Sequence, residues 1–362
     1  HKYRVAHWIQ EVARSIVSFK LSGNTQLALS KNDDLVCDYL KARESHFQVI
    51  KLQYIKMIAF KVTVTAGLLV IGGALVLNQQ MNIGQFVAAE IVILLVINSV
   101  EKLIISLETL YDMLTAIEKL GQVVDLKLEP QEGKTPEITS TFRLELDDVW
   151  YSVDGREEPV LKNISFCVEP KEVVLLKGVS GSGKSSLMRV LAGVNTPTSG
   201  SVFVDNTNLK ALQLNHYRSH LGLSLSDEMP FEGTLIENLT FGASDFDHAY
   251  LDELLQNIGL KDFIKTLPMG LETLISPEGR HISYTITKKI ILVRALLKRP
   301  KVLLLEDPLD QFRPEETAKI IDYLCDKKHE WSIVVVSNNS HWNTKCSKAL
   351  ELNEGQITSL KK

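Results

Sequence analysis

Hydrophobic positions follow two different patterns along the 362 residues, and the pattern changes near residue 130. Before that point, apolar residues form two long runs, VTVTAGLLVIGGALVL at 62–77 and IGQFVAAEIVILLVINSV at 83–100. After it, short β-branched runs such as EVVLLKG, KVLLLED and SIVVVS alternate with helical stretches. The long runs predict membrane-length helices, whereas the alternation predicts an α/β unit with a largely parallel sheet.

Basic residues on either side of the apolar runs predict how the runs are oriented. Each run approaches the roughly 20 residues that a helix needs to cross a bilayer. The turn between them, NQQMN, is uncharged, whereas the outer flanks carry Arg43, Lys51, Lys56, Lys61, Lys102 and Lys119. We therefore expect membrane helices over about 57–77 and 84–107, with both outer ends cytoplasmic and the turn external. A buried helical hairpin of a soluble domain is the alternative.

The stretches around the apolar runs complete the expected organisation. Residues 8–56 are amphipathic and rich in charge, which predicts cytoplasmic extensions of the membrane helices. Gly67, Gly72 and Gly73 suit close helix packing. Residues 126–141 contain Pro130, Gly133 and Pro136 and few large apolar side chains, so they predict a linker.

Composition narrows the classes of function. Hydrophobic residues make up 45 % of the chain and the mean hydropathy is +0.03, which fits a mixed membrane and soluble architecture. The net charge of −4 gives no basic footprint for a nucleic-acid partner. The four cysteines contain no CxxC pair, so neither a zinc site nor a disulfide framework is indicated. The chain starts at His1 without a signal-peptide core, and we expect a fragment whose beginning lies upstream.

The segment GVSGSGKSS at 178–186 has the complete spacing of a phosphate-binding loop. It follows an apolar strand and precedes a predicted helix, where backbone N–H groups can surround a phosphate. Lys184 is expected to reach the β- and γ-phosphates, and Ser185 to offer its hydroxyl to Mg²⁺. The residues expected to bind ATP in this loop are Gly178, Ser180, Gly181, Ser182, Gly183, Lys184, Ser185 and Ser186.

The segment KVLLLEDPLD supplies a second candidate for the metal. Its aliphatic run ends in Glu306 and Asp307, which places acids at the tip of a strand beside the phosphate loop. Glu306 is the predicted second Mg²⁺ ligand, and the alternative is an ordinary strand that ends in solvated acids.

The order of these segments resembles an ATP-binding cassette (ABC) exporter half-transporter. The resemblance rests on the hydrophobic hairpin, the linker, the phosphate loop, LPMGLETLISPEGR, VRALLKRPKVLLLEDP and ELNEGQI. It implies a type IV exporter-like helical membrane domain fragment at 1–125, with a coupling helix near 31–42. It also implies an α/β P-loop NTPase nucleotide-binding domain at 142–362, with ATP and Mg²⁺ as cofactors and a second half-transporter as partner.

Residues at the family's hydrolytic motifs depart from its pattern. The LSGGQ signature aligns with Ile282–Ile286, where Ser283 is retained but Tyr284 and Thr285 replace glycines. The metal-binding aspartate and the general-base glutamate appear inverted, so that Asp307 stands at the base position. The switch histidine aligns with Asn338, which can bind a phosphate but cannot carry a charge. His341 could substitute if the loop bends differently.

Residues at three further family positions are also changed. The glutamine that senses the γ-phosphate aligns with Ser226, and the aromatic residue that stacks on adenine aligns with Val153. Tyr151 or Trp150 could replace that aromatic residue after a small shift. An aspartate of the loop after Pro308 aligns with Arg313.

Three hypotheses follow for the function. The first is an exporter subunit in the inner or plasma membrane, with a cytoplasmic nucleotide-binding domain, weak hydrolysis of its own and a more intact partner in a heterodimer. The second is a regulatory membrane subunit that binds ATP without turnover. The third is an active homodimeric exporter. The hydrophobic hairpin makes a soluble P-loop kinase the poorest fit.

Overall fold

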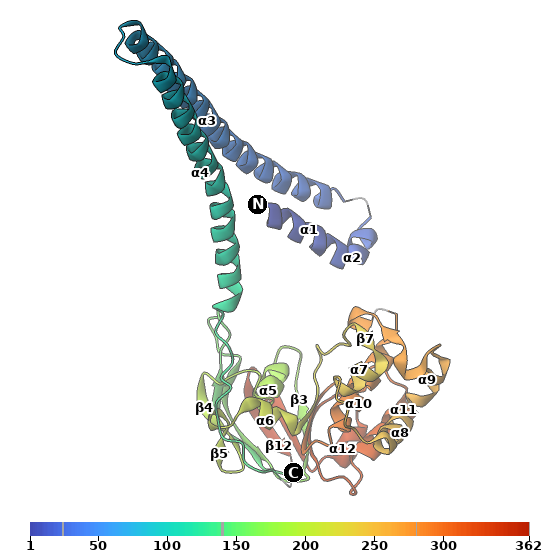
Figure 1. Ribbon diagram of the computed structural model, residues 1–362. Coiled ribbons are helices and arrows are strands. Elements are labelled where there is room, and N and C mark those ends of the chain that lie inside the picture. Colours follow the sequence, from blue (N-terminus) through green and yellow to red (C-terminus); the bar gives the residue numbers. More distant parts are fainter. Residues whose placement is uncertain (24, 139–140, 280, 362) are drawn as a thin grey trace. The chain divides into compact units, whose positions relative to one another are not determined.

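The chain divides into two compact units, His1–Lys127 and Leu128–Lys362, in a computed structural model (Figure 1). The structure describes residues 1–23, 25–138, 141–279 and 281–361. The unit boundary falls inside the predicted linker at 126–141. The change of hydrophobic pattern near residue 130 therefore coincides with a structural boundary.

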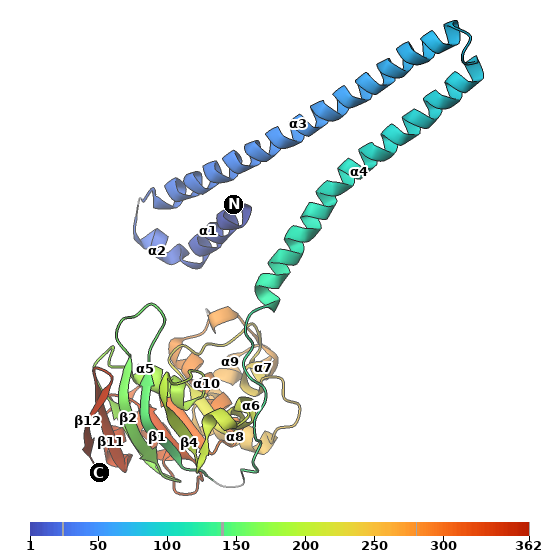
Figure 2. The ribbon, with the colours of Figure 1, turned by 90° about the vertical axis from the view of Figure 1, so that its left-hand side faces the viewer.

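The first unit is built from helices. They are α1 (Lys2–Arg14), α2 (Ile16–Leu21), α3 (Leu27–Leu77) and α4 (Ile83–Val124). α3 and α4 form a hairpin (Figure 2), and at its turn the Asn82 side chain accepts a hydrogen bond from the Gln85 amide at 2.8 Å. Gly72 is buried, and a Cβ there would lie 2.4 Å from the Phe86 ring. Gly72 thus permits close packing as expected, whereas Gly67 and Gly73 face open space.

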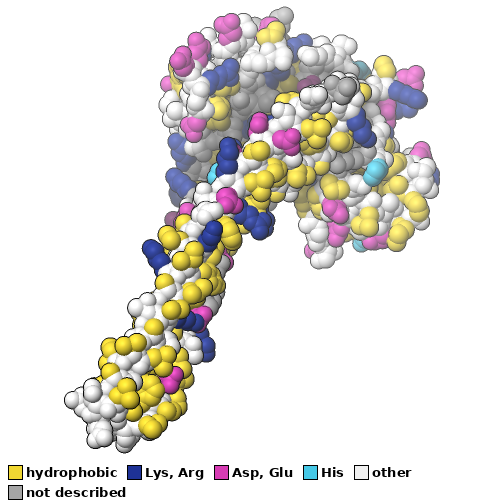
Figure 3. All heavy atoms as spheres, turned by 90° about the horizontal axis from the view of Figure 1, so that it is seen from above, with side chains coloured by type: hydrophobic (Ala, Val, Ile, Leu, Met, Phe, Trp, Pro, Cys, Tyr) yellow, Lys and Arg dark blue, Asp and Glu magenta, His cyan; other side chains and the backbone are white. Residues whose placement is uncertain are grey.

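Both long helices contain a stretch that is long and apolar enough to cross a membrane. Only 6 % of each stretch is buried, and Figure 3 shows hydrophobic side chains along the outside of the helices. This exposure does not match the core hairpin of a soluble domain, whose apolar side would be covered. An ion pair between Lys61 and Glu101 joins α3 to α4.

Residues 31–42, the predicted coupling helix, lie inside the continuous helix α3 and do not form a separate element. They contain neither glycine nor proline, so their backbone has no reason to break the helix. The chain is interrupted earlier, between α2 and α3, where Gly23 has a φ of +72°. The predicted membrane helices at 57–77 and 84–107 are likewise parts of longer helices.

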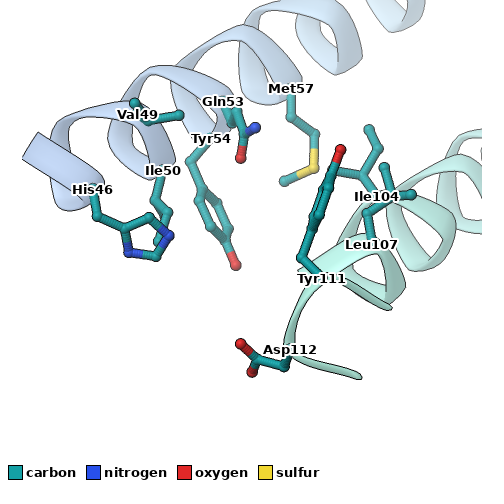
Figure 4. A pocket seen from close by; sticks show the side chains of 10 residues that line it. All are labelled: His46, Val49, Ile50, Gln53, Tyr54, Met57, Ile104, Leu107, Tyr111 and Asp112. Carbon is teal, nitrogen blue, oxygen red and sulfur yellow. The ribbon is translucent and has the colours of Figure 1, made fainter. Parts of the chain in front are cut away.

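Outside the apolar stretches, α3 and α4 border a cavity of about 330 Å³ (Figure 4). Its lining includes His46 and Tyr54 from α3 and Tyr111 and Asp112 from α4. His46 and Tyr54 belong to the segment predicted to extend beyond the membrane, and Tyr111 and Asp112 follow the membrane helix predicted at 84–107.

The second unit contains two main sheets and a short strand pair. The antiparallel sheet, in the order β2-β1-β4-β5, consists of β1 (Leu144–Tyr151), β2 (Leu161–Val168), β4 (Ser199–Val204) and β5 (Thr207–Asn208). The other sheet, in the order β12-β11-β3-β10-β9-β6, consists of β3 (Val173–Lys177), β6 (Leu221–Ser224), β9 (Val302–Glu306), β10 (Ser332–Val336), β11 (Lys348–Asn353) and β12 (Gln356–Lys361). The short pair is β7 (Gly233–Thr234) and β8 (Leu274–Ile275). The six-stranded sheet is largely parallel, as the sequence pattern predicted, whereas the separate antiparallel sheet was not predicted.

The second unit also contains helices. They are α5 (Lys184–Leu191), α6 (Leu214–Ser219), α7 (Leu235–Thr240), α8 (His248–Asn257), α9 (Lys261–Thr266), α10 (Tyr284–Leu297), α11 (Pro314–Leu324) and α12 (His341–Lys345). Three 3₁₀ turns lie at Leu209–Ala211, Gly270–Glu272 and Pro277–Gly279. Successive residues of the central strands pack into two different hydrophobic cores, one on each face of the sheet. Leu304 belongs to the core that contains α5, and Leu303 and Leu305 belong to the core that contains α8, α10 and α11. Burial on both faces explains why these strands are continuously apolar.

His329 provides a pH-dependent contribution to stability. Its ring stacks on Trp331, with the centroids 3.9 Å apart, and burial lowers its pKa below the usual 6.5. The unfolded chain therefore binds a proton at His329 more readily than the folded chain does. The contribution of the neutral His329 ring to the free energy of unfolding is fully present above pH 6.5 and is lost as the pH falls below that value. From pH 7.5 to 5.5 we expect the melting temperature of His329→Phe to fall about 2 °C less than that of the wild type.

The matched control for this prediction is His248→Phe. His248 also contacts an aromatic ring, that of Phe246 at 4.5 Å, but it is exposed. Melting curves of both variants at a series of pH values check the effect. Parallel curves for wild type and His329→Phe would contradict it.

Candidate functional site

The loop at 178–183 joins β3 to α5 and depends on its glycines. A Cβ at Gly178, where φ is +150°, would lie 2.2 Å from the Leu352 carbonyl oxygen. Gly181 and Gly183 have φ values of +81° and +103°, in the region that side chains disfavour. The loop therefore packs tightly against its neighbours at Gly178 and takes a backbone conformation at Gly181 and Gly183 that only glycine adopts easily.

Positive charge and free N–H groups gather at this loop. The Lys184 ammonium donates hydrogen bonds to the carbonyl oxygens of Gly178 at 2.9 Å and Val179 at 2.7 Å. α5 begins at Lys184, and the first turn of a helix leaves its N–H groups without intrahelical acceptors. This combination favours an anion such as a phosphate, so the residues present fit the phosphates of ATP.

Strand register brings the other predicted residues to the same edge. Val336 of β10 pairs with Leu176 of β3 on one side and with Glu306 of β9 on the other. On the next strand, Ser224 of β6 pairs with Leu305. Because these strands are parallel, the segments that follow them leave the sheet at one edge, where α/β proteins bind ligands. Ser226, Asp307 and Asn338 all belong to those segments.

Glu306 connects the phosphate loop with the segment after β6. Its side chain is buried and accepts a hydrogen bond from the Ser185 hydroxyl. Its second carboxylate oxygen accepts from the Ser226 amide at 3.2 Å. Ser226 reaches this position through its backbone, while the residue itself is exposed. The oxygen atoms of Ser185 and Glu306 form a donor set that suits Mg²⁺.

Asp307 follows directly and has an unusual backbone. Its φ is +41°, and its amide donates to the Val336 carbonyl oxygen at 2.9 Å. Burial raises the pKa of the Asp307 carboxyl, and the nearby Asp310 and Glu306 raise it further, while Lys184 and Lys288 act in the opposite direction. The Asp307 carboxylate is therefore partly shielded from water and lies near two other carboxylates.

Asn338 lies in the segment after β10 and is exposed. Within the described ranges, its side chain makes no hydrogen bond to the protein. His341, the possible substitute, has its Nε2 3.1 Å from the Asp322 carboxylate on α11, which Lys345 also contacts. The structure therefore ties the His341 ring to α11.

The aligned signature forms the start of α10. The Ser283 hydroxyl accepts a hydrogen bond from the Ile286 amide at 3.3 Å and lies 3.0 Å from the Thr285 hydroxyl. Ser283 therefore caps its own helix. Tyr284 is 38 % exposed and places a ring where the family pattern has a bare backbone.

Lys288 lies beside the site, next to Ser226, and was not predicted from the sequence. Its side chain is 1 % exposed, and its ammonium donates to the carbonyl oxygens of Leu225 at 3.5 Å and Ser226 at 3.4 Å. Burial lowers its pKa, against the opposing effect of the nearby Glu228, Glu306 and Asp307. The sequence feature that could have indicated this position is the pair Lys288 and Lys289 within an otherwise apolar helix. Lysines are usually exposed, so burial of Lys288 was not expected.

Comparison with known proteins agrees with this geometry. Residues 161–310 match the family model described as ABC transporter. The chain carries an ABC transporter domain. Over 242 residues it is 32 % identical to the probable microcin-H47 secretion/processing ATP-binding protein MchF of Escherichia coli. Over 244 residues it is 28 % identical to an ATP-dependent lipid A-core flippase of Saccharophagus degradans.

The lengths of these matches differ between the chain and its relatives. The two alignments cover 66 % and 67 % of this chain, but only 34 % and 42 % of the relatives' own lengths. A solved structure described as a bacterial Atm1-family ABC exporter with ATP bound superposes with a TM-score of 0.89, at 18 % identity. That match covers 99 % of this chain and 63 % of the other. The fold is therefore an exporter-type helical region followed by an α/β P-loop NTPase domain.

The aromatic residues near the expected adenine position, Trp150 and Tyr151, make contacts within the ABC domain. Tyr151 packs against the core and is half-buried. The Trp150 indole donates to the Asp148 carboxylate at 2.9 Å. Val153, by contrast, is 45 % exposed and offers an aliphatic surface. Arg313, at the aligned aspartate position, is the exposed residue before α11.

Proposed function

We propose that this chain is a subunit of an ATP-driven membrane exporter, one that binds Mg-ATP at its own phosphate loop but hydrolyses it slowly. The observation that supports the proposal is that one site has the residues for binding Mg-ATP but altered residues at the positions for hydrolysis. The phosphate loop, Lys184 and the Ser185–Glu306 contact are all present, whereas Asp307 and Asn338 stand at the hydrolytic positions.

The residues of the site would divide the work as follows. The loop amides and Lys184 hold and neutralise the phosphates. Ser185 and Glu306 would hold Mg²⁺, which supplies positive charge to the β- and γ-phosphate oxygens. Asp307 is a methylene shorter than the glutamate of the family, so it orients water less well, and Asn338 cannot contribute a positive charge.

The same reasoning extends to the partner and the location. ABC exporters of this kind pair two nucleotide-binding domains, so the altered signature around Ser283 would weaken the site that it completes on the partner. We therefore favour a heterodimer with a more intact half-transporter. The two apolar helices support a location in the inner or plasma membrane, with the ABC domain on the cytoplasmic side.

Nucleotide binding and phosphate release by the full chain in lipid nanodiscs test this proposal. We expect saturable binding of a fluorescent ATP analogue with Mg²⁺, and turnover about 100-fold below the roughly 10 s⁻¹ of a typical enzyme. Turnover should rise when a half-transporter with intact motifs is co-reconstituted. Brisk turnover by the chain alone would instead favour an active homodimer. No turnover in either case would favour a regulatory subunit gated by ATP occupancy.

A further inference from the structure

The segment that leads into the ABC domain is attached to its surface. The Lys134 amide donates to the Ala211 carbonyl oxygen at 2.8 Å, and the Gln213 amide donates to the Lys134 carbonyl oxygen at 3.0 Å. A Cβ at Gly133 would lie 2.4 Å from the Gln213 nitrogen, so the two backbones are in direct contact. The segment predicted to be a linker is therefore held against the ABC domain along part of its length.

Arg218 of α6 is the centre of this attachment. Its guanidinium donates to both carboxylate oxygens of Glu129, at 2.7 Å and 2.5 Å. It also donates to the carbonyl oxygens of Gly193 at 2.5 Å and Ala192 at 3.4 Å. The hydrogen bond from Arg218 lowers the pKa of Glu129, because it stabilises the charged carboxylate. A two-pronged, charge-assisted contact of this kind fixes orientation as well as distance.

The carbonyl groups that Arg218 binds lie at the end of the phosphate-loop helix. α5 runs over eight residues from Lys184 to Leu191, about 12 Å, so its first turn faces the phosphate site and its last turn faces Arg218. Next to Arg218, the buried Tyr217 donates its hydroxyl to the Leu191 carbonyl oxygen at 2.6 Å. Cationic and donor groups at this end complement the helix dipole. Arg218 is thus a positioning residue that joins α5 to Glu129.

We propose that Glu129 and Arg218 form a latch that transmits the state of the phosphate-loop helix to the end of α4. α4 ends at Val124 and β1 begins at Leu144, so an unattached linker would be long and compliant. With the latch closed, only residues 125–128 separate α4 from an anchored point. The latch rests on the proposed function, because it needs ATP to bind the loop at the start of α5.

Hydrogen exchange at the Lys134 and Gln213 amides of the full chain in nanodiscs tests the latch. Glu129→Gln removes the charge but leaves the contacts of Arg218 with α5. Glu132→Gln is the matched control, because Glu132 is exposed and lines the same cavity as Glu129. We expect Mg-ATP to slow exchange at both amides about threefold or more in wild type and Glu132→Gln, and to have no such effect in Glu129→Gln.

A second readout follows from the reciprocity of coupled equilibria. If ATP stabilises the latch, opening the latch must weaken ATP binding by the same factor, here about threefold. Arg218→Lys, which keeps the charge but loses the two-pronged contact, should give an intermediate result. Unchanged exchange and affinity in Glu129→Gln would overturn the latch while the proposed function stands. Absence of ATP binding in wild type would overturn both.

Discussion

The double variant Asp307→Glu with Asn338→His is expected to hydrolyse ATP about 100-fold faster than the wild type. Asp307 follows Glu306 directly, and Val336 of β10 lies in register with Glu306, so the segments that hold Asp307 and Asn338 leave the sheet side by side. The added methylene extends the carboxylate toward the expected water, and a histidine can carry the charge that an asparagine lacks. Phosphate release by the full chain under saturating Mg-ATP measures the effect.

The control for this gain is Asp245→Glu with Asn343→His. It makes the same chemical changes at two exposed positions, Asp245 just before α8 and Asn343 on α12. Its turnover should equal that of the wild type. If the Asp307 and Asn338 variant also remains at the wild-type rate, the assignment of these two positions is wrong or the signature around Ser283 limits the reaction.

Lys184→Ala is expected to weaken ATP binding about 100-fold. A charge-assisted hydrogen bond contributes about 1.5–3 kcal/mol, and its loss converts to one to two factors of ten in affinity. In the structure the Lys184 ammonium lies against the loop carbonyl oxygens of Gly178 and Val179, so its charge is already positioned at the phosphate loop. Titration with a fluorescent ATP analogue gives the dissociation constant.

Lys261→Ala serves as the control for Lys184→Ala. Lys261 forms a surface ion pair with Asp252 at 2.8 Å, away from the phosphate loop in the sequence. Surface pairs of this kind contribute little to stability, so affinity and melting temperature should be unchanged. Equal ATP affinity in Lys184→Ala and Lys261→Ala would show that the loop is not where ATP binds.

Local patterns were sufficient for the strands and the phosphate loop. The runs around Val174, Leu304 and Val334 are continuously apolar because both faces of these strands are buried, and all three form strands of one sheet. The glycines at 178, 181 and 183 indicated a loop with positive φ angles, a backbone conformation that residues with a side chain rarely adopt. Residues 31–42, predicted to be a coupling helix, are instead part of the longer helix α3, because no residue among them interrupts the helical pattern.

Contacts between distant segments could not be read from the sequence. The antiparallel pairing of β1 with β4, the burial of Lys288 against Ser226 and the attachment of Glu129 to Arg218 join residues far apart in the chain. The residues next to each partner in the sequence give no indication of the contact. An acid in a linker and an arginine on a short helix become a latch only when the fold sets them at hydrogen-bonding distance.

The sequence by itself determined the two-part organisation, the apolar helices, the class of the second unit and the identity of the phosphate-binding loop, because all of these depend on residues close together in the chain. Tertiary structure alone decided which groups meet at the edge of the sheet. It joined Glu306 to Ser185, kept His341 on α11 and attached the linker to the end of α5. The physical reason is that strand register and helix packing set distances between side chains, and neither can be computed from neighbouring residues.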